Sequence, residues 1–152
     1  MSAAEPGPMY WEDYELGDRR TSGGRTITET DIVIHAGQTN DFSPYTNDAE
    51  WAKTQPFGQR IAHGTLTFAV GVGLGGVVRG DQAFSYGYDH LRFVKPVFIG
   101  DTIHAEVTIS EKREDPKRPD RGFVHEQGDI RNQRGETTMV FTHIHSVEKR
   151  PG

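Results

Sequence analysis

The sequence predicts an α+β fold in which an antiparallel sheet curves around one long buried helix. The residues after His63 form a continuous apolar, glycine-rich segment whose apolar side chains occupy every side of a helix, which is typical of a buried one. From Phe84 onward the chain changes to extended segments that are separated by turn residues. Helices followed by a block of strands indicate an α+β domain rather than a parallel sheet.

Composition limits the classes of function. A chain of 152 residues is expected to form a single domain, 1–152, with residues 1–8 as a flexible tail. The net charge of -5 argues against nucleic acid as a partner, and the absence of cysteine excludes disulfides and a cysteine nucleophile. No apolar run is long enough for a membrane span, and the first residues lack the features of a signal peptide. We therefore expect a cytoplasmic protein.

The N-terminal half is expected to be one strand followed by helices. Residues 25–29 alternate as a short strand does. Thr30 is the predicted N-cap of the next helix, and Pro44 is predicted to end it, because the residue before a proline avoids the helical conformation. Asp48 is predicted to cap a second short helix over residues 49–53.

The central helix is expected from His63 to Val77. Its glycines weaken helix propensity, but they suit a backbone that presses closely against a sheet or a ligand. A buried pair of strands is the competing interpretation of the same residues. The strands that follow are predicted to pair in sequence order as a meander; they cover residues 83–97, 101–112, 122–132 and 136–147.

Candidate chemistry gathers between Asp41 and Gly64. Asp41 precedes a proline-fixed turn that is rich in hydroxyl groups, and His63 and Gly64 stand where the buried helix begins. A helix N-terminus offers free N–H groups, and a carboxylate facing them suits acid–base work on a carbonyl compound. Taken alone, Asp41 is more often an acid satisfied by a local turn, and His63 a structural histidine.

The other histidines are interpreted as structural. His35 lies six residues before Asp41, so the two side chains would point about 120° apart on a helix, and His35 is expected to serve packing or the surface. His143 and His145 alternate on one predicted strand, with His104 on another, but a metal site there lacks a third ligand in register. We expect neither a metal nor a cofactor.

The run DFSPYTNDAEWAK…PFGQRIAHGTLTFAV resembles the signature of MaoC-like (R)-specific enoyl-CoA hydratases and dehydratases, which have the hotdog fold. The segments YWEDYELGD, RTITETDI, LRFVKPVFIGDTI and IRNQRGE also resemble that family, so the likeness covers nearly the whole chain. It implies an acyl-CoA or acyl-carrier thioester as substrate, no cofactor, and a homodimer or higher homo-oligomer with its tunnel at the subunit interface.

The resemblance also implies roles for individual residues. The family pattern is Asp, any residue, Asn, Pro, an apolar residue and His, of which Asp41 and Pro44 match. Gly64 matches the glycine whose N–H meets the thioester oxygen. Ser43 and Tyr45 fill the Asn and apolar positions and, with His63, are expected to bind substrate. Thr46 stands in place of the catalytic histidine, and a threonine cannot take a proton near neutral pH.

Three functions follow as hypotheses. The first is a lyase of fatty acid metabolism that adds water reversibly to an enoyl thioester, with Asp41, Thr46 and Gly64 as catalytic residues. The second is a non-catalytic acyl-CoA-binding protein, or an inactive partner subunit. The third is a hotdog thioesterase, in which a carboxylate activates water for attack on the thioester carbonyl.

Overall fold

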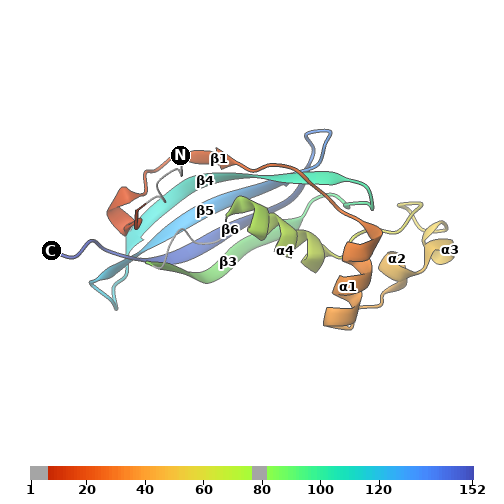
Figure 1. Ribbon diagram of the computed structural model, residues 1–152, viewed down its shortest axis with the longest axis horizontal. Coiled ribbons are helices and arrows are strands. Elements are labelled where there is room, and N and C mark those ends of the chain that lie inside the picture. The colour runs from red at the N-terminus through yellow and green to blue at the C-terminus, as the bar shows by residue number, and fades with distance from the viewer. Residues whose placement is uncertain (1–6, 77–81) are drawn as a thin grey trace, which may run out of the picture.

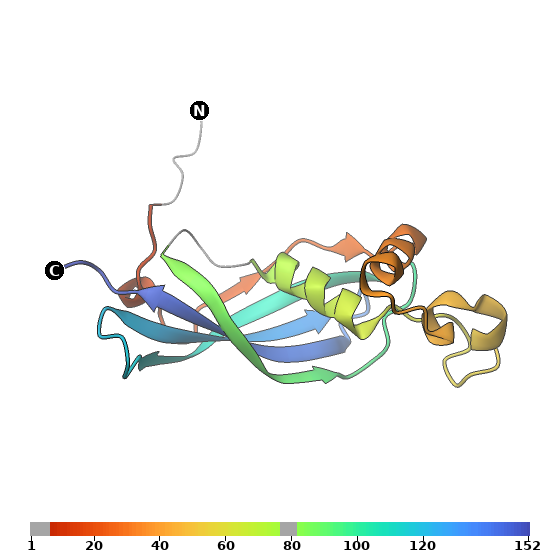
Figure 2. The ribbon, with the colours of Figure 1, turned by 90° about the horizontal axis from the view of Figure 1, so that it is seen from below.

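The computed structural model describes residues 7–76 and 82–152, and most of the expected N-terminal tail lies outside this part of the chain. A long, twisted antiparallel sheet curves around one helix, α4 (Gly64–Gly75), as Figures 1 and 2 show. This is the predicted α+β hotdog arrangement, and it excludes the alternative of a buried strand pair. The expected helix end, Val77, falls outside the described residues.

The sheet has the strand order β1-β4-β5-β6-β3, with β2 also paired to β4. The expected meander is therefore correct for β4, β5 and β6 but wrong for β3, which lies at the far edge beside β6. The strands are β1 (Arg19–Thr21), β2 (Arg25–Thr26), β3 (Ala83–Phe93), β4 (Thr102–Glu114), β5 (Arg121–Arg131) and β6 (Thr137–Glu148).

The connection from β3 to β4 explains this error. This connection does not close a hairpin between β3 and β4. Instead, the loop is hydrogen-bonded to the residues just before α4. Ile61 forms an isolated bridge with Phe98, and the N–H of Ala62 donates to the carbonyl oxygen of Val97 at 2.7 Å. The turn expected at residues 132–135 is confirmed, because the N–H of Gly135 bonds to the carbonyl oxygen of Asn132 between β5 and β6.

Three short helices gather at the end of the molecule where α4 begins (Figure 1). They are α1 (Glu29–Thr39), α2 (Pro44–Asn47) and α3 (Ala49–Ala52). The N-cap of α1 is Thr28 rather than the predicted Thr30, because Thr28 and Asp31 form a reciprocal capping box. Asp48 caps α3 as predicted, by accepting a hydrogen bond from the N–H of Trp51.

The prediction that Pro44 ends the first helix is wrong. α1 already stops at Thr39, followed by Asn40 in the left-handed conformation at φ 61°. Pro44 instead opens α2 as its first residue, where a proline's missing N–H costs nothing. The left-handed residue reverses the chain after α1, so the segment with Asp41 turns back toward the start of α4.

The core lies between α4 and the concave face of the sheet. Leu66 of α4 packs with buried side chains of β4, β5 and β6, including Ile103, Ile130 and Met139. Gly71 lets the helix approach the sheet, because a Cβ there would lie 2.8 Å from Ile130 Cγ1. Close packing of this kind fixes the position of α4, and hence of its N-terminus.

The segment before α1 forms part of the sheet. A short 3-10 turn, Trp11–Asp13, is followed by strand β1, which the sequence did not predict and which pairs with β4. Within the described ranges 7–76 and 82–152, every helix is too short or too polar to cross a membrane.

Candidate active site

The N-terminus of α4 is the centre of the candidate site. Gly64 is its first residue, and the N-cap residue His63 makes no side-chain capping hydrogen bond. The first N–H groups of a helix have no intrahelical partner, and the positive end of the helix dipole lies there. The helix therefore presents donors that can stabilise negative charge on a ligand.

A pocket of about 320 Å³ opens beside this terminus. Thr67, Lys95 and Thr138 contribute polar atoms, but most of the lining is apolar. Gly64 reaches the pocket with its backbone, and a Cβ there would lie 2.8 Å from Phe93 Cζ, so a larger residue would crowd the entrance. The apolar lining consists of Phe57, Ile61, Ala62, Phe93, Val94, Pro96 and Val97.

Asp41 is attached to the same terminus through its backbone. The buried imidazole of His63 donates from Nε2 to the carbonyl oxygen of Asp41 at 2.9 Å. The carboxylate of Asp41 accepts a hydrogen bond from the N–H of Ser43 at 3.2 Å, and the side chain is exposed. The structure thus brings the segment of Asp41 beside the residue that precedes Gly64, with the carboxylate open to an incoming molecule.

The remaining residues of the motif serve the turn itself. Ser43 is the N-cap of α2, and its carbonyl oxygen accepts the hydroxyl proton of Thr46 at 2.9 Å. Thr46 is buried, and its Oγ1 also accepts a hydrogen bond from the side chain of Asn47. Tyr45 is partly exposed and packs edge-on against Trp51 and near Phe57, a residue of the pocket.

His35 joins the site although the sequence interpretation set it aside. Its Nε2 shares a hydrogen bond of 2.7 Å with Thr65 Oγ1, and its ring centroid lies 4.9 Å from that of His63. Burial, and then the neighbouring His63, lower the pKa of His35, while the charge of Asp41 acts in the opposite direction. The spacing argument failed because Asp41 lies beyond the end of α1, where the chain has reversed.

A separate polar cluster lies at the other end of α4. Arg20 of β1 donates to both carboxylate oxygens of Glu126 and to the carbonyl oxygen of Gly75, the last residue of α4. His145 bonds to Glu126 at 3.1 Å, and His143 lies against His145 and bonds to Ser85. This cluster satisfies the C-terminus of the helix, where a cation is favourable.

Glu126, His143 and His145 present possible metal-ligand atoms within 4.8 Å of one another, and His104 does not belong to this group. Arg20, however, occupies both oxygens of Glu126, so a cation would compete with a guanidinium.

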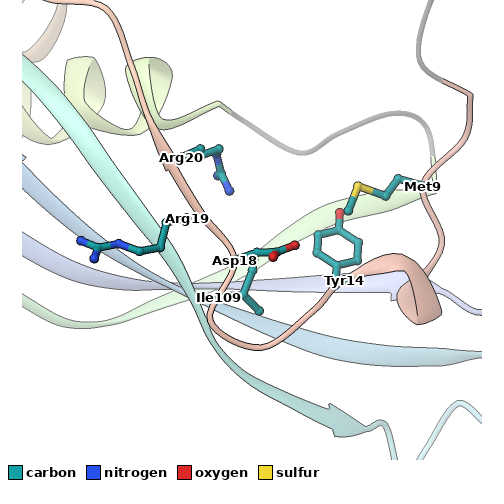
Figure 3. A pocket seen from close by; sticks show the side chains of 6 residues that line it. All are labelled: Met9, Tyr14, Asp18, Arg19, Arg20 and Ile109. Carbon is teal, nitrogen blue, oxygen red and sulfur yellow. The ribbon is translucent and has the colours of Figure 1, made fainter.

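Arg20 also lines a pocket of about 280 Å³ with Met9, Tyr14, Asp18, Arg19 and Ile109. Figure 3 shows Arg19 and Arg20 leaving β1 on opposite sides.

Comparison with known proteins identifies the family of this chain. Residues 16–122 match the family described as "MaoC like domain". The chain is 38% identical to an (R)-specific enoyl-CoA hydratase of Rhodospirillum rubrum over 72% of this chain and 76% of that protein. It superposes on a MaoC-like dehydratase from the same species with a TM-score of 0.84 and 31% identity, covering 95% of this chain and 100% of the other.

A solved structure described as a monoamine oxidase regulatory protein from Archaeoglobus fulgius is also similar. Its TM-score is 0.89 at 33% identity, and the match covers 95% of this chain and 97% of that one. The family match spans more than half of the chain and includes the turn of Asp41, the N-terminus of α4 and strands β1 to β4. The chain therefore belongs to the family of proteins with a MaoC-like domain.

Proposed function

We propose that this protein is a hydratase and dehydratase that adds water reversibly to the double bond of an enoyl thioester carried by CoA or an acyl carrier. One observation carries the proposal: the uncapped N-terminus of α4 at Gly64 opens onto an apolar pocket, and the segment of Asp41 is hydrogen-bonded to the adjoining residue. The names of the relatives above describe the same chemistry and support the choice of substrate class.

The proposed chemistry uses these parts in simple roles. The thioester oxygen accepts a hydrogen bond from the N–H of Gly64, and negative charge that develops on this oxygen is stabilised by the helix terminus. The exposed carboxylate of Asp41 holds the water that adds to the double bond. The apolar pocket receives the acyl group. Addition of water is redox-neutral overall, so we propose that no cofactor takes part.

Thr46 enters this proposal only as the residue that holds the turn. Its hydroxyl proton is already donated to Ser43, and its side chain is 4% exposed. Among the residues predicted to bind substrate, Tyr45 has the most direct route, because it packs near Phe57 at the pocket. His63 and Ser43 act by positioning Asp41 through their hydrogen bonds to it.

The acting unit is proposed to be a homodimer. β3 is an edge strand, and Phe93 at its end and Val94 next to it are more than half exposed while they also line the pocket. A second copy of this chain placed against β3 would pair the free edge and cover the pocket, which would then lie at the subunit interface.

The test is a side-by-side assay with crotonyl-CoA for hydration and butyryl-CoA for hydrolysis. The proposal expects loss of the double bond of crotonyl-CoA without release of free CoA. Release of free thiol as the main product would favour the thioesterase alternative instead. Saturable binding of crotonyl-CoA without any conversion would favour the non-catalytic binding protein. Either of these two results would overturn the proposed hydratase.

A further inference from the structure

We propose that His35 is the proton carrier of this site and does the work that Thr46 cannot do. The inference rests on the proposed hydratase function and deepens it. Its starting point is geometric: an imidazole from α1 is bonded to the second residue of α4, next to the proposed oxyanion donor Gly64.

The fold holds His35 in this place from two sides. On α1, Ile32 and Ala36 are fully buried, so the helix is fixed in rotation and presents His35, which is half-buried, toward α4. At α4, the 2.7 Å hydrogen bond between Nε2 and Thr65 Oγ1 fixes the ring itself. A side chain that is held by both packing and a hydrogen bond is suited to proton transfer, because its geometry is set before the reaction begins.

The charges around His35 also suit a base. Burial and His63 lower its pKa below the ordinary value of 6.5, so the imidazole is neutral at pH 7 and can accept a proton. Two titratable groups act on it among the described residues: His63 from the segment before α4, and Asp41 from the segment after α1. Once His35 is protonated, the carboxylate of Asp41 stabilises the imidazolium charge.

His35 is a better candidate than His63, the histidine inside the motif. His63 is 3% exposed, and its Nε2 already donates to the carbonyl oxygen of Asp41, which leaves Nδ1 buried without a partner in the described part of the chain. His35 uses Nε2 for Thr65, and its Nδ1 makes no hydrogen bond to the described residues. That second nitrogen is the one that can meet a water held by Asp41.

The proposed step balances without any further reactant. Nδ1 of His35 takes one proton from the water held by Asp41, while the water oxygen forms a bond to C3 of the enoyl thioester. The π electrons of the C2–C3 bond move toward the thioester oxygen, where the N–H of Gly64 stabilises the charge. The imidazolium then returns its proton to C2, so that one water has been added across the double bond.

The experiment compares His35→Gln, His35→Ala and wild type in crotonyl-CoA hydration. Glutamine can still bond to Thr65 but cannot carry the proton, so we expect kcat to fall about 10²-fold or more, with a smaller change in KM. In wild type, kcat should also fall at acid pH, where His35 becomes protonated. This fall is the acid limb of the pH–rate profile, and the profile of His35→Gln should lack it. Added imidazole should restore part of the activity of His35→Ala, and should not rescue Asp41→Asn.

His104→Gln is the matched control. His104 lies in β4 between Ile103 and Ala105, which face the core, so its side chain is on the opposite face of the sheet from α4. The hydration activity and the pH profile of His104→Gln should match those of wild type.

If wild type hydrates crotonyl-CoA and His35→Gln keeps both its rate and its acid limb, His35 is not the proton carrier, although the proposed function stands. If His35→Gln is slower but keeps the acid limb, and imidazole rescues nothing, the role of His35 is structural and the inference fails. If wild type itself does not hydrate crotonyl-CoA, the proposed function fails first and this inference falls with it.

Discussion

The main chain of Asp41 is hydrogen-bonded to the residue that precedes α4. The imidazole of His63 binds the main-chain oxygen of Asp41, and the next residue, Gly64, begins α4. The carboxylate of Asp41 therefore remains exposed and unused by the fold, apart from one contact to the N–H of Ser43. A residue that is held by its backbone and free at its side chain can take part in chemistry without a loss of structure.

Gly64→Ala tests whether the helix terminus must be accessible to the thioester. The added Cβ would lie 2.8–3.0 Å from three ring atoms of Phe93 and would obstruct the approach of a thioester. We expect kcat/KM for crotonyl-CoA hydration to fall at least about tenfold. The melting temperature should change little, because Phe93 is half exposed and can move aside.

Gly73→Ala is the control on the same helix. A Cβ at Gly73 meets nothing within 4 Å, so this variant should keep full activity and gain stability of up to about 1 kcal/mol from better helix propensity. Equal activity in Gly64→Ala and Gly73→Ala would contradict the role given to Gly64.

Thr46→Val separates a structural from a chemical role at position 46. Valine has nearly the shape of threonine but cannot bond to Ser43 or Asn47, so stability should fall by about 1–2 kcal/mol. The hydration rate of the folded variant should stay within about twofold of wild type, since Thr46 takes no proton in the proposed step. Normal stability together with a collapsed rate would show that Thr46 acts in the chemistry.

The sequence predicts part of this site for clear physical reasons. Asp41 and Gly64 stand out because a glycine opens a buried helix and an acid precedes a proline-fixed turn. His35 does not stand out, because its relation to Asp41 depends on Asn40, whose left-handed conformation ends α1 and reverses the chain. An argument from helical spacing assumes a continuous helix, and here the helix had already ended.

At the scale of elements, the two ends of α4 differ in their chemistry. Its N-terminus is left open at the candidate site, while its C-terminal carbonyl groups bond to Arg20, which is paired with the buried Glu126. Burial alone would raise the pKa of Glu126, but hydrogen bonds from His145 and Arg20 outweigh it and lower this pKa to about 2. Burial, and then His145, lower the pKa of His143 to about 4.

These two shifts predict a loss of stability in acid. Below pH 6.5 the unfolded chain protonates His143 while the folded chain does not until about pH 4, so the free energy of unfolding falls across that interval. Below pH 4.5 the same argument applies to Glu126, down to about pH 2. Thermal melts from pH 7 to pH 4 should show a steadily falling melting temperature.

The melting temperature of His143→Gln should depend less steeply on pH than that of wild type, even if the variant is less stable at every pH, because this buried histidine no longer titrates. His104→Gln, on the other face of the sheet, should leave the slope unchanged. A slope between pH 6.5 and 5 that is the same in wild type and His143→Gln would contradict the assignment of this effect to the buried cluster.

The elements themselves were largely predictable, and their partners were less so. The extended segments after residue 83 and the buried helix follow from local patterns. The place of β3 beside β6 does not follow from local patterns. It depends on the loop around Val97, which is hydrogen-bonded to Ala62 and does not close a hairpin. β1 was not predicted, because a strand of three residues is too short to show an alternation of apolar and polar side chains.

At the scale of the whole molecule, the edge strand β3 is the most conspicuous open surface. Phe84 and Tyr86 on this strand are 44% and 62% exposed, and the edge has no partner strand among the described residues. A free strand edge favours pairing with another chain, and the exposed rings of β3 add apolar surface next to it. A second copy would meet both this edge and the pocket at Gly64.

The dimer prediction is tested by light scattering coupled to size-exclusion chromatography. Wild type should elute with a mass of two chains of 17.0 kDa at micromolar concentration. Tyr86→Lys should shift the protein toward the monomer and reduce hydration, whereas Leu16→Lys, a similar change at an exposed site away from β3, should not. A wild-type monomer with full activity would contradict the dimeric site.

The central claim is that the exposed carboxylate of Asp41, a residue whose main chain is bonded to the residue before α4, is needed to add water to an enoyl thioester. The most direct test compares Asp41→Asn with Asp48→Asn in crotonyl-CoA hydration. Asp48 caps α3, and asparagine caps a helix equally well, so this variant should keep the wild-type rate. Asp41→Asn should lose about 10²-fold or more, because an amide cannot hold the water as a carboxylate does. A wild-type rate in Asp41→Asn would contradict the account.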